Sequence, residues 1–215
     1  IVASLVGSEM CIRDSTRTAL WTPMIESCGI AEARRIWNDS DMVAESLCVA
    51  CLFEGEVALR NRLDLADMFG ARTLVLITGG FEDLAATGYS GGIEHARSLL
   101  IDRLGAAAEL ATDHRVRLAF EPLHPMVCGF RSVVSSLGEA LDVLDQLDDG
   151  HDIGLAIDAY ALWWEHDLQA KLMRAGDRIL NYHVSDWLSD TRDLRLDRGM
   201  PCLLYTSPSP RDWLQ

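Results

Sequence analysis

The sequence has little positive charge, no long apolar stretch and no secretion signal. Its 215 residues carry a formal net charge of −14, and Lys171 is the only lysine. An acidic surface repels a phosphate backbone, so the composition predicts a protein with no nucleic-acid partner. No apolar run reaches the ~18 residues of a transmembrane helix, and no basic segment followed by an apolar one opens the chain. We therefore expect a cytoplasmic protein with no membrane partner.

The cysteines lack the regular spacing of a disulfide framework. Cys48 and Cys51 form a CxxC pair, a spacing found in some metal and redox sites. The pair lies within the apolar run 47–53, however, and side chains three residues apart on a strand point to opposite faces. We interpret both as buried small side chains rather than as a paired thiol site.

Apolar runs alternate with stretches of helical periodicity along most of the chain. The runs are typical of buried parallel strands and cover residues 46–53, 73–78, 116–121, 153–158 and 179–185. The periodic stretches predict helices at 56–69, 93–111, 137–147 and 167–175. Repeated strand–helix connection implies a parallel sheet, either a doubly wound sheet or a (β/α)8 barrel. The dinucleotide-binding fingerprint GxGxxG is absent, which favours the barrel.

Three predicted strands end in a side chain that can bind a metal ion. Glu121 follows "RLAF", Asp158 ends "GLAID" and His183 ends "LNYH". The carboxyl ends of the strands carry the reactive groups in a (β/α)8 barrel, so we expect these side chains to meet. Two carboxylates and an imidazole favour Mn²⁺, Mg²⁺ or Co²⁺ over a metal that prefers thiolates. A single carboxylate at a strand end is usually solvated or caps the next helix, so the metal interpretation depends on the coincidence of all three side chains.

The segments "LAFEPLHP", "GLAIDAYALWW" and "HVSDWLSDTRDLRLDRGMP" together resemble the xylose isomerase-like TIM-barrel proteins. This family includes sugar phosphate isomerases and epimerases, D-tagatose 3-epimerase-like enzymes and endonuclease IV. The resemblance extends over roughly residues 21–201. It implies an α/β fold, here an incomplete (β/α)8 TIM barrel that lacks the first strand, most of the second and the eighth.

The resemblance also implies a metal site whose ligands are Glu, Asp, His and a second Glu. Glu121, Asp158 and His183 match the first three ligands, and no residue of the chain matches the fourth. The implied activity is that of a divalent-metal-dependent isomerase or epimerase of a small sugar or sugar phosphate. In such an enzyme two carboxylates move a proton next to a carbonyl group through an enediolate. Glu121 would be one of these two catalytic carboxylates.

Other residues match the family's substrate pocket less directly. Arg198 matches a position near the substrate, and His124 and Trp21 are expected to contact the sugar. Asp186 is expected to orient the metal-binding histidine. Ala161 stands where many relatives have a substrate-binding histidine. Each of the four also has a plainer interpretation. Arg198 would be a surface residue and His124 a loop residue, Trp21 would belong to the core, and Asp186 would cap a helix.

Three other activities remain open. A lyase acting on inosose-type cyclitols would use the same site and release water. An endonuclease IV-like hydrolase of abasic DNA needs more metal ligands and a basic groove, and the six histidines and the net charge of −14 argue against it. The third is a barrel that binds sugar or metal without turnover. A homo-oligomeric state is left open as well.

The two ends of the chain differ from its middle. The segments "LVGSEMCIRDS" and "CLLYTSPSPRD" can be encoded by DNA sequences that are reverse complements of each other, and this DNA resembles a transposon-library sequencing adapter. We therefore expect residues 1–15 and 202–215 to be adapter-derived, and residues 16–201 to be a partial TIM-barrel domain of a longer protein, called the parent protein below. An open barrel exposes unpaired strand edges, so the 215-residue chain is expected to be poorly soluble and inactive.

Overall fold

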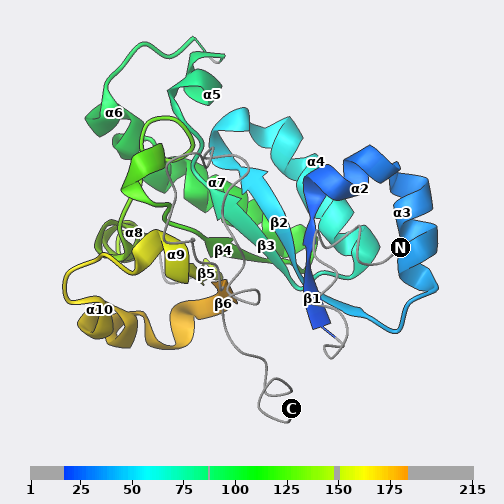
Figure 1. Ribbon diagram of the computed structural model, residues 1–215. Helices are drawn as coiled ribbons and strands as arrows, with labels where there is room; N and C mark the ends of the chain where they lie inside the picture. Colours follow the sequence, from blue (N-terminus) through cyan, green and yellow to red (C-terminus); the bar gives the residue numbers. More distant parts are fainter. Residues whose placement is uncertain (1–16, 87, 148–150, 184–215) are drawn as a thin grey trace, which may run out of the picture.

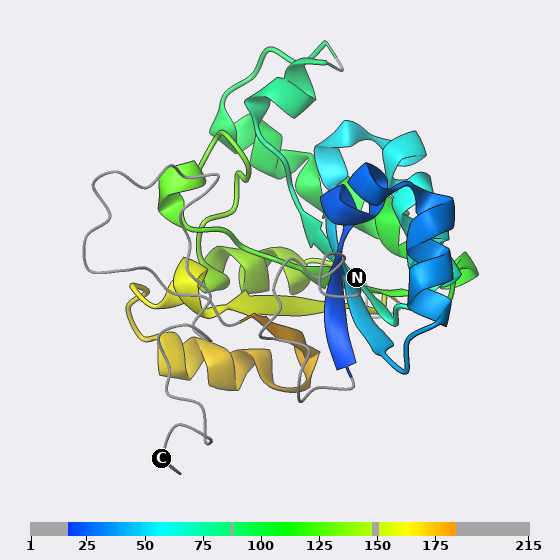
Figure 2. The same cartoon turned by 45° about the vertical axis from the view of Figure 1, so that its right-hand side comes forward.

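A computed structural model describes residues 17–86, 88–147 and 151–183. In this part of the chain six parallel strands form one sheet in the order β1-β2-β3-β4-β5-β6 (Figure 1). The strands are β1 Arg17–Trp21, β2 Val43–Cys51, β3 Thr73–Ile77, β4 Arg117–Phe120, β5 Ile153–Asp158 and β6 Ile179–His183. The sheet curls with helices around it, and the fold is the predicted incomplete (β/α)8 TIM barrel (Figure 2).

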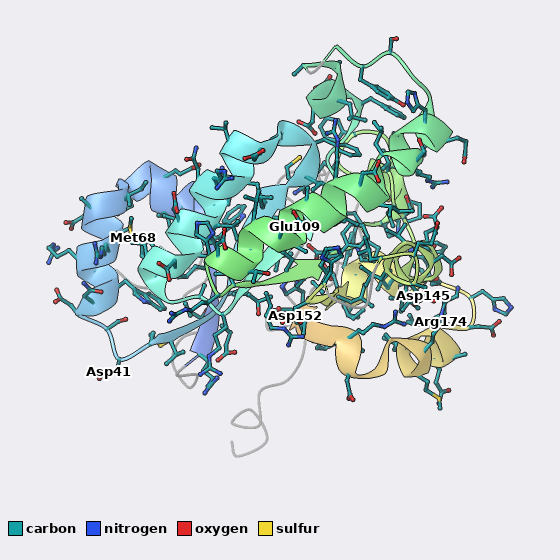
Figure 3. The ribbon with its side chains drawn as sticks, turned by 180° about the vertical axis from the view of Figure 1, so that it is seen from behind. Asp41, Met68, Glu109, Asp145, Asp152 and Arg174 are labelled. Atoms are coloured by element: carbon teal, nitrogen blue, oxygen red, sulfur yellow. The ribbon has the colours of Figure 1, made fainter. Side chains whose placement is uncertain are left out.

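Helices connect the strands and cover the outer face of the sheet. They are α2 Thr22–Cys28, α3 Ile30–Asn38, α4 Glu56–Phe69, α5 Phe81–Ala85, α6 Ile93–Ser98, α7 Leu100–Asp113, α8 Leu137–Leu144, α9 Ala159–Leu162 and α10 Leu168–Ala175, with short 3₁₀ turns η1 Leu52–Glu54, η2 Pro125–Val127 and η3 Gly176–Arg178. Seen from behind, α7 lies across the sheet (Figure 3), where it packs against β4 and α4. None of the helices in the described residues is long and apolar enough to cross a membrane.

All of the strands expected from apolar runs are present, as β2 to β6. The helix expected over 93–111 is instead two helices that meet at Leu99. There the Leu99 N–H bonds to the Ala96 carbonyl at 3.3 Å, which is a 3₁₀-type turn, and the Ser98 hydroxyl donates to the His95 carbonyl at 2.8 Å. These local bonds compete with the α-helical pattern, and apolar periodicity does not register them.

The apolar core has two parts on opposite faces of the sheet. Leu74, Leu76 and Phe120 are fully buried in the layer between the sheet and the helices. Val75 and Ala119 belong to a small separate cluster on the inner face of the curl. All five residues of β3 are buried, as expected for a central parallel strand that packs on both faces.

A buried carboxylate joins α8 to the segment that leads into α10. Glu165, whose side chain is 2% exposed, accepts hydrogen bonds from the N–H groups of Leu137 at 2.7 Å and of the following residue at 3.0 Å. The Lys171 ammonium donates to the same carboxylate at 2.6 Å. These bonds satisfy N–H groups that the first turn of a helix leaves without partners. On the outer surface the two helices are also joined by the ion pair of Arg174 with Asp145 (Figure 3).

Candidate functional site

Three side chains that can bind a metal ion meet at the carboxyl ends of neighbouring strands. Glu121 directly follows β4, and Asp158 and His183 are the last residues of β5 and β6. Asp158 and His183 are register partners in the β5–β6 pair, so their side chains leave the same face of the sheet. One ligand atom from each of the three residues lies within 4.8 Å of the others. The sequence prediction that these residues converge therefore agrees with the geometry.

The His183 imidazole is held between two partners. Its Nδ1 lies 3.0 Å from Oε1 of Glu121, which is 7% exposed, and its Nε2 lies 3.9 Å from the Cys48 sulfur. Burial has the largest single effect on the pKa of His183 and lowers it. The hydrogen bonds to Cys48 and Glu121, together with their charges, outweigh that effect and raise the pKa to about 11. The surrounding groups therefore favour a positive charge at this position, either on the protonated ring or on a bound cation that replaces the proton.

The donor set fits a divalent metal ion. Two carboxylates and an imidazole from three rigid strands supply oxygen and nitrogen ligands, which Mn²⁺, Mg²⁺, Co²⁺ and Zn²⁺ accept. Asp158 is held in place because its Oδ1 accepts the Tyr160 N–H at 2.8 Å and caps α9. Glu121 is positioned by its own N–H, which extends the ladder to β3 by bonding to the Leu76 carbonyl at 2.9 Å.

A cavity of about 200 Å³ contains all three ligands. It is lined by Trp21, Cys48, Val49, Ile77, Glu121, Leu123, His124, Met126, Val127, Arg131, Asp158, Tyr160, Ala161 and His183. Trp21 and His124, which the sequence suggested as substrate contacts, are both in this lining. Trp21 is the last residue of β1, so its placement follows from the same rule that predicted the metal ligands.

His124 is fixed as a neutral hydrogen-bond donor. Its Nδ1 accepts the Met126 N–H at 3.1 Å, so in the neutral ring the proton is on Nε2. Burial lowers the pKa of His124 below its usual value, which favours the neutral ring near pH 7. The ring packs against Tyr160 and Trp164, with centroid separations of 5.4 and 6.2 Å. His124 therefore offers an N–H rather than a positive charge.

The remaining sequence predictions are only partly placed. Arg198 and Asp186 lie outside the described residues. Ala161 is 2% exposed and lines the cavity, so the position expected to carry a histidine in relatives does face the site. Sequence reasoning missed Tyr160 and Arg131, because both belong to segments after a strand end whose path no periodicity predicts.

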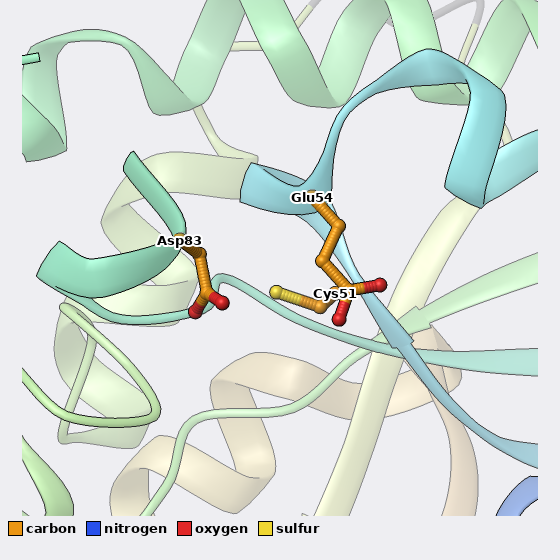
Figure 4. A group of neighbouring side chains, drawn as sticks. All are labelled: Cys51, Glu54 and Asp83. Carbon is orange, nitrogen blue, oxygen red and sulfur yellow. The ribbon is translucent and has the colours of Figure 1, made fainter. Parts of the chain in front are cut away.

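A second group of side chains lies beside the first cavity. One ligand atom each from Cys51, Glu54 and Asp83 lies within 4.8 Å of the others (Figure 4). Burial, helped by the Asp83 charge, raises the pKa of Cys51 to about 12, so its thiol keeps its proton and contacts the Thr78 carbonyl. Asp83 accepts the Gly80 N–H at 2.7 Å. Protein contacts thus account for the positions of Cys51 and Asp83.

The two cysteines of the CxxC pair contact different groups of residues. Cys48 faces His183 in the first cavity, whereas Cys51 belongs to the second group. Neither is fully buried, and in this the structure differs from the sequence interpretation. Cys51 is the last residue of β2, and Cys48 lies three residues before it.

Residues 57–203 match the family described as xylose isomerase-like TIM barrel, which is more than half of the chain. The chain belongs to this family. The xylose isomerase-like TIM barrel family accounts for both the curled parallel sheet and the position of the candidate site at its carboxyl edge.

Solved structures agree with the family assignment. Protein SMc04130 from Sinorhizobium meliloti 1021 is 35% identical, with a TM-score of 0.74 over 89% of this chain and 71% of that chain. An IOLI protein with a bound zinc atom is 14% identical, with a TM-score of 0.66 over 90% of this chain and 71% of that one. The 3-keto-D-glucoside 4-epimerase YcjR from E. coli is 16% identical, with a TM-score of 0.57 over 73% and 64%. The latter two likenesses show the fold alone. No curated protein matches the chain.

Proposed function

We propose that the parent protein is a divalent-metal-dependent isomerase or epimerase of a small sugar or sugar phosphate. The observation that supports this proposal best is the convergence of Glu121, Asp158 and His183 on one cavity. The fold is shared with a protein that binds zinc and with a sugar epimerase, which is consistent with the proposal. Residues 1–15 and 202–215 are proposed to be adapter-derived and to have no part in this function.

Glu121, Asp158 and His183 would hold the metal ion. When bound there, a divalent cation polarises the substrate carbonyl and stabilises negative charge on adjacent substrate oxygens. The strands fix the three side chains before binding, so little order has to be gained when the site is filled.

The proposed chemical step is removal of the proton next to the carbonyl by the Glu121 carboxylate. The C–H electron pair becomes the C=C bond of an enediolate, and the carbonyl π electrons move to the oxygen. Return of a proton to the opposite face of the same carbon restores the carbonyl and gives the epimer. Return to the neighbouring carbon gives the isomer when the hydroxyl proton of the first carbon also moves to the enediolate oxygen, so that the first carbon becomes the carbonyl. A second carboxylate would deliver that proton from the other side, and the resemblance assigns this role to the second Glu of the family's metal site, which no residue of this chain matches.

His124 and Trp21 would position the sugar. The Nε2–H of His124 can donate to a hydroxyl or carbonyl oxygen without placing a second positive charge near the metal. The Trp21 ring, 46% exposed, offers an apolar surface to the C–H face of a sugar.

Proton exchange with solvent tests the proposal. The parent protein, loaded with Mn²⁺, is incubated in D₂O with a panel of ketoses, and deuterium at the carbon next to the carbonyl is followed by NMR. We expect incorporation, and we expect Glu121→Gln to slow it by about 10²- to 10⁴-fold because a positioned base is lost. Glu109→Gln, the same change on the exposed outer surface of α7, is the control and should leave the rate unchanged.

Absence of exchange across the whole panel would refute the proposal. Loss of water from an inosose-type substrate would instead assign the site to the dehydratase alternative. Salt-sensitive binding of abasic DNA would favour the hydrolase.

A further inference from the structure

One arginine lines the candidate site and has no ion-pair partner in the described part of the chain. Arg131 lies in the loop between η2 and α8, and among the described residues that line the cavity it is the only lysine or arginine. Its side chain is exposed, and no described carboxylate lies within ion-pairing distance of it, in contrast to Arg97, Arg117 and Arg174. Arg131 therefore keeps its charge available to a ligand.

The backbone on both sides of Arg131 is anchored. The next residue, Ser132, is fully buried, and its hydroxyl lies 3.2 Å from the Thr78 hydroxyl at the end of β3. The Val133 N–H donates to the same Thr78 oxygen at 2.8 Å. Before Arg131, the Gly129 carbonyl accepts the N–H that begins α5 at 2.8 Å. The exposed guanidinium is thus carried by a loop with a fixed path.

The same loop packs closely on the end of β3. A Cβ atom at Gly80 would come within 2.1 Å of the Phe130 carbonyl oxygen, so only a glycine permits this approach. Together with the Thr78 bonds, this contact fixes the position of the loop backbone at Arg131. A loop that is already ordered loses less conformational entropy when its arginine binds a ligand than a mobile loop does.

Arg131 also lies at the boundary between two cavities. The second cavity, of about 410 Å³, shares Val49, Ile77 and Arg131 with the first. Its other walls include three carboxylates, those of Glu54, Glu82 and Asp83. Its second arginine, Arg62, is already paired with Glu26. The negative charge of these carboxylates therefore disfavours entry of an anion from Arg131 into the second cavity.

We propose that Arg131 binds an anionic group of the substrate, a carboxylate or a phosphate. This inference rests on the proposed function, whose substrate class it narrows to an acidic sugar. The guanidinium can donate two parallel hydrogen bonds to either anion. The acidic second cavity limits the ligand to a small sugar whose anionic group lies at the boundary between the two cavities.

Matched substrates test the inference. For the Mn²⁺-loaded parent protein, kcat and KM are measured with a neutral ketose, the corresponding ketose phosphate and the corresponding keto-uronate. We expect the wild type to prefer an anionic member, and Arg131→Gln to lower the ratio of kcat/KM values, anionic over neutral, at least tenfold, mainly through KM. Arg131→Lys should restore part of this ratio, and the phosphate and uronate arms distinguish the two anions. Arg34→Gln, at an exposed arginine of α3, is the control and should keep the wild-type ratio.

Equal kcat/KM values for neutral and anionic sugars in the wild type would overturn the inference, as would a loss in Arg131→Gln that is the same for both. Equilibrium binding of inorganic phosphate and of acetate supplies a readout that does not depend on turnover. If no sugar exchanges protons but these anions bind in an Arg131-dependent way, the proposed function fails and the anion site stands. If ketoses exchange protons but Arg131→Gln leaves the anionic-over-neutral ratio of kcat/KM values unchanged, the proposed function stands and this inference fails.

Discussion

At the scale of single residues, two buried serines on the strands and loops around the site have opposite surroundings. The Ser46 hydroxyl in β2 is fully buried and has no hydrogen-bond partner among the described residues. The Ser132 hydroxyl is equally buried, but it makes two hydrogen bonds with Val134. It donates to the Val134 carbonyl at 2.7 Å and accepts a hydrogen bond from the Val134 N–H at 3.1 Å. An unpaired buried hydroxyl costs free energy, whereas a paired one stabilises. We predict that Ser46→Ala leaves the free energy of unfolding of the parent protein unchanged or higher, and that Ser132→Ala lowers it by about 1–3 kcal/mol. Urea unfolding of the two variants makes the comparison, and an equal loss in both would mean that Ser46 has a partner after all.

At the scale of elements, His114 links the end of α7 to α4. Its Nδ1 donates to the Leu110 carbonyl at 2.9 Å, and its Nε2 lies 3.0 Å from Asp64. The bond to Leu110 is the largest effect on the pKa of His114 and raises it; burial opposes this, and Asp64 adds to it. The folded state therefore favours the protonated ring. Its stabilisation is complete below the unfolded pKa of about 6.5 and is lost as the pH rises through the higher folded pKa. We predict that Asp64→Asn reduces this pH dependence of the unfolding free energy by up to about 1 kcal/mol.

Chemical denaturation between pH 5.5 and 9 measures that effect, with Glu109→Gln on α7 (Figure 3) as the control that keeps the wild-type slope. An Asp64→Asn variant with an unaltered slope would contradict the assignment.

The arrangement of the elements also shows where prediction from sequence succeeds. Apolar runs located β2 to β6, and strand ends located Glu121, Asp158 and His183, because the burial of a parallel strand leaves a continuous local pattern. The contact of Ser132 with Thr78, 54 residues away, leaves no such pattern, so the loop that carries Arg131 was missed.

At the scale of the whole molecule, a metal ion would join three strands that come from different parts of the chain. Glu121, Asp158 and His183 follow or end β4, β5 and β6, so the unfolded chain cannot present them together. A ligand that binds only the folded state stabilises it, by about 2.7 kcal/mol at a hundredfold excess over Kd. We predict that Mn²⁺ raises the melting temperature of the parent protein, that EDTA reverses the rise, and that Asp158→Asn removes most of it. Asp152→Asn, an exposed carboxylate just before β5 (Figure 3), is the matched control. Equal shifts in both variants would point to diffuse binding of cations by an acidic surface.

The close approach of the Phe130 carbonyl to Gly80 has a consequence for how substrate preference can change among relatives. The loop that carries Arg131 packs closely against the turn after β3, although about fifty residues separate the two segments in the sequence. Placing this loop alone into a relative that has a larger residue at the position of Gly80 would drive that residue's Cβ into the Phe130 carbonyl. We therefore expect that, among relatives, changes of the loop that alter substrate specificity occur together with changes at the position of Gly80.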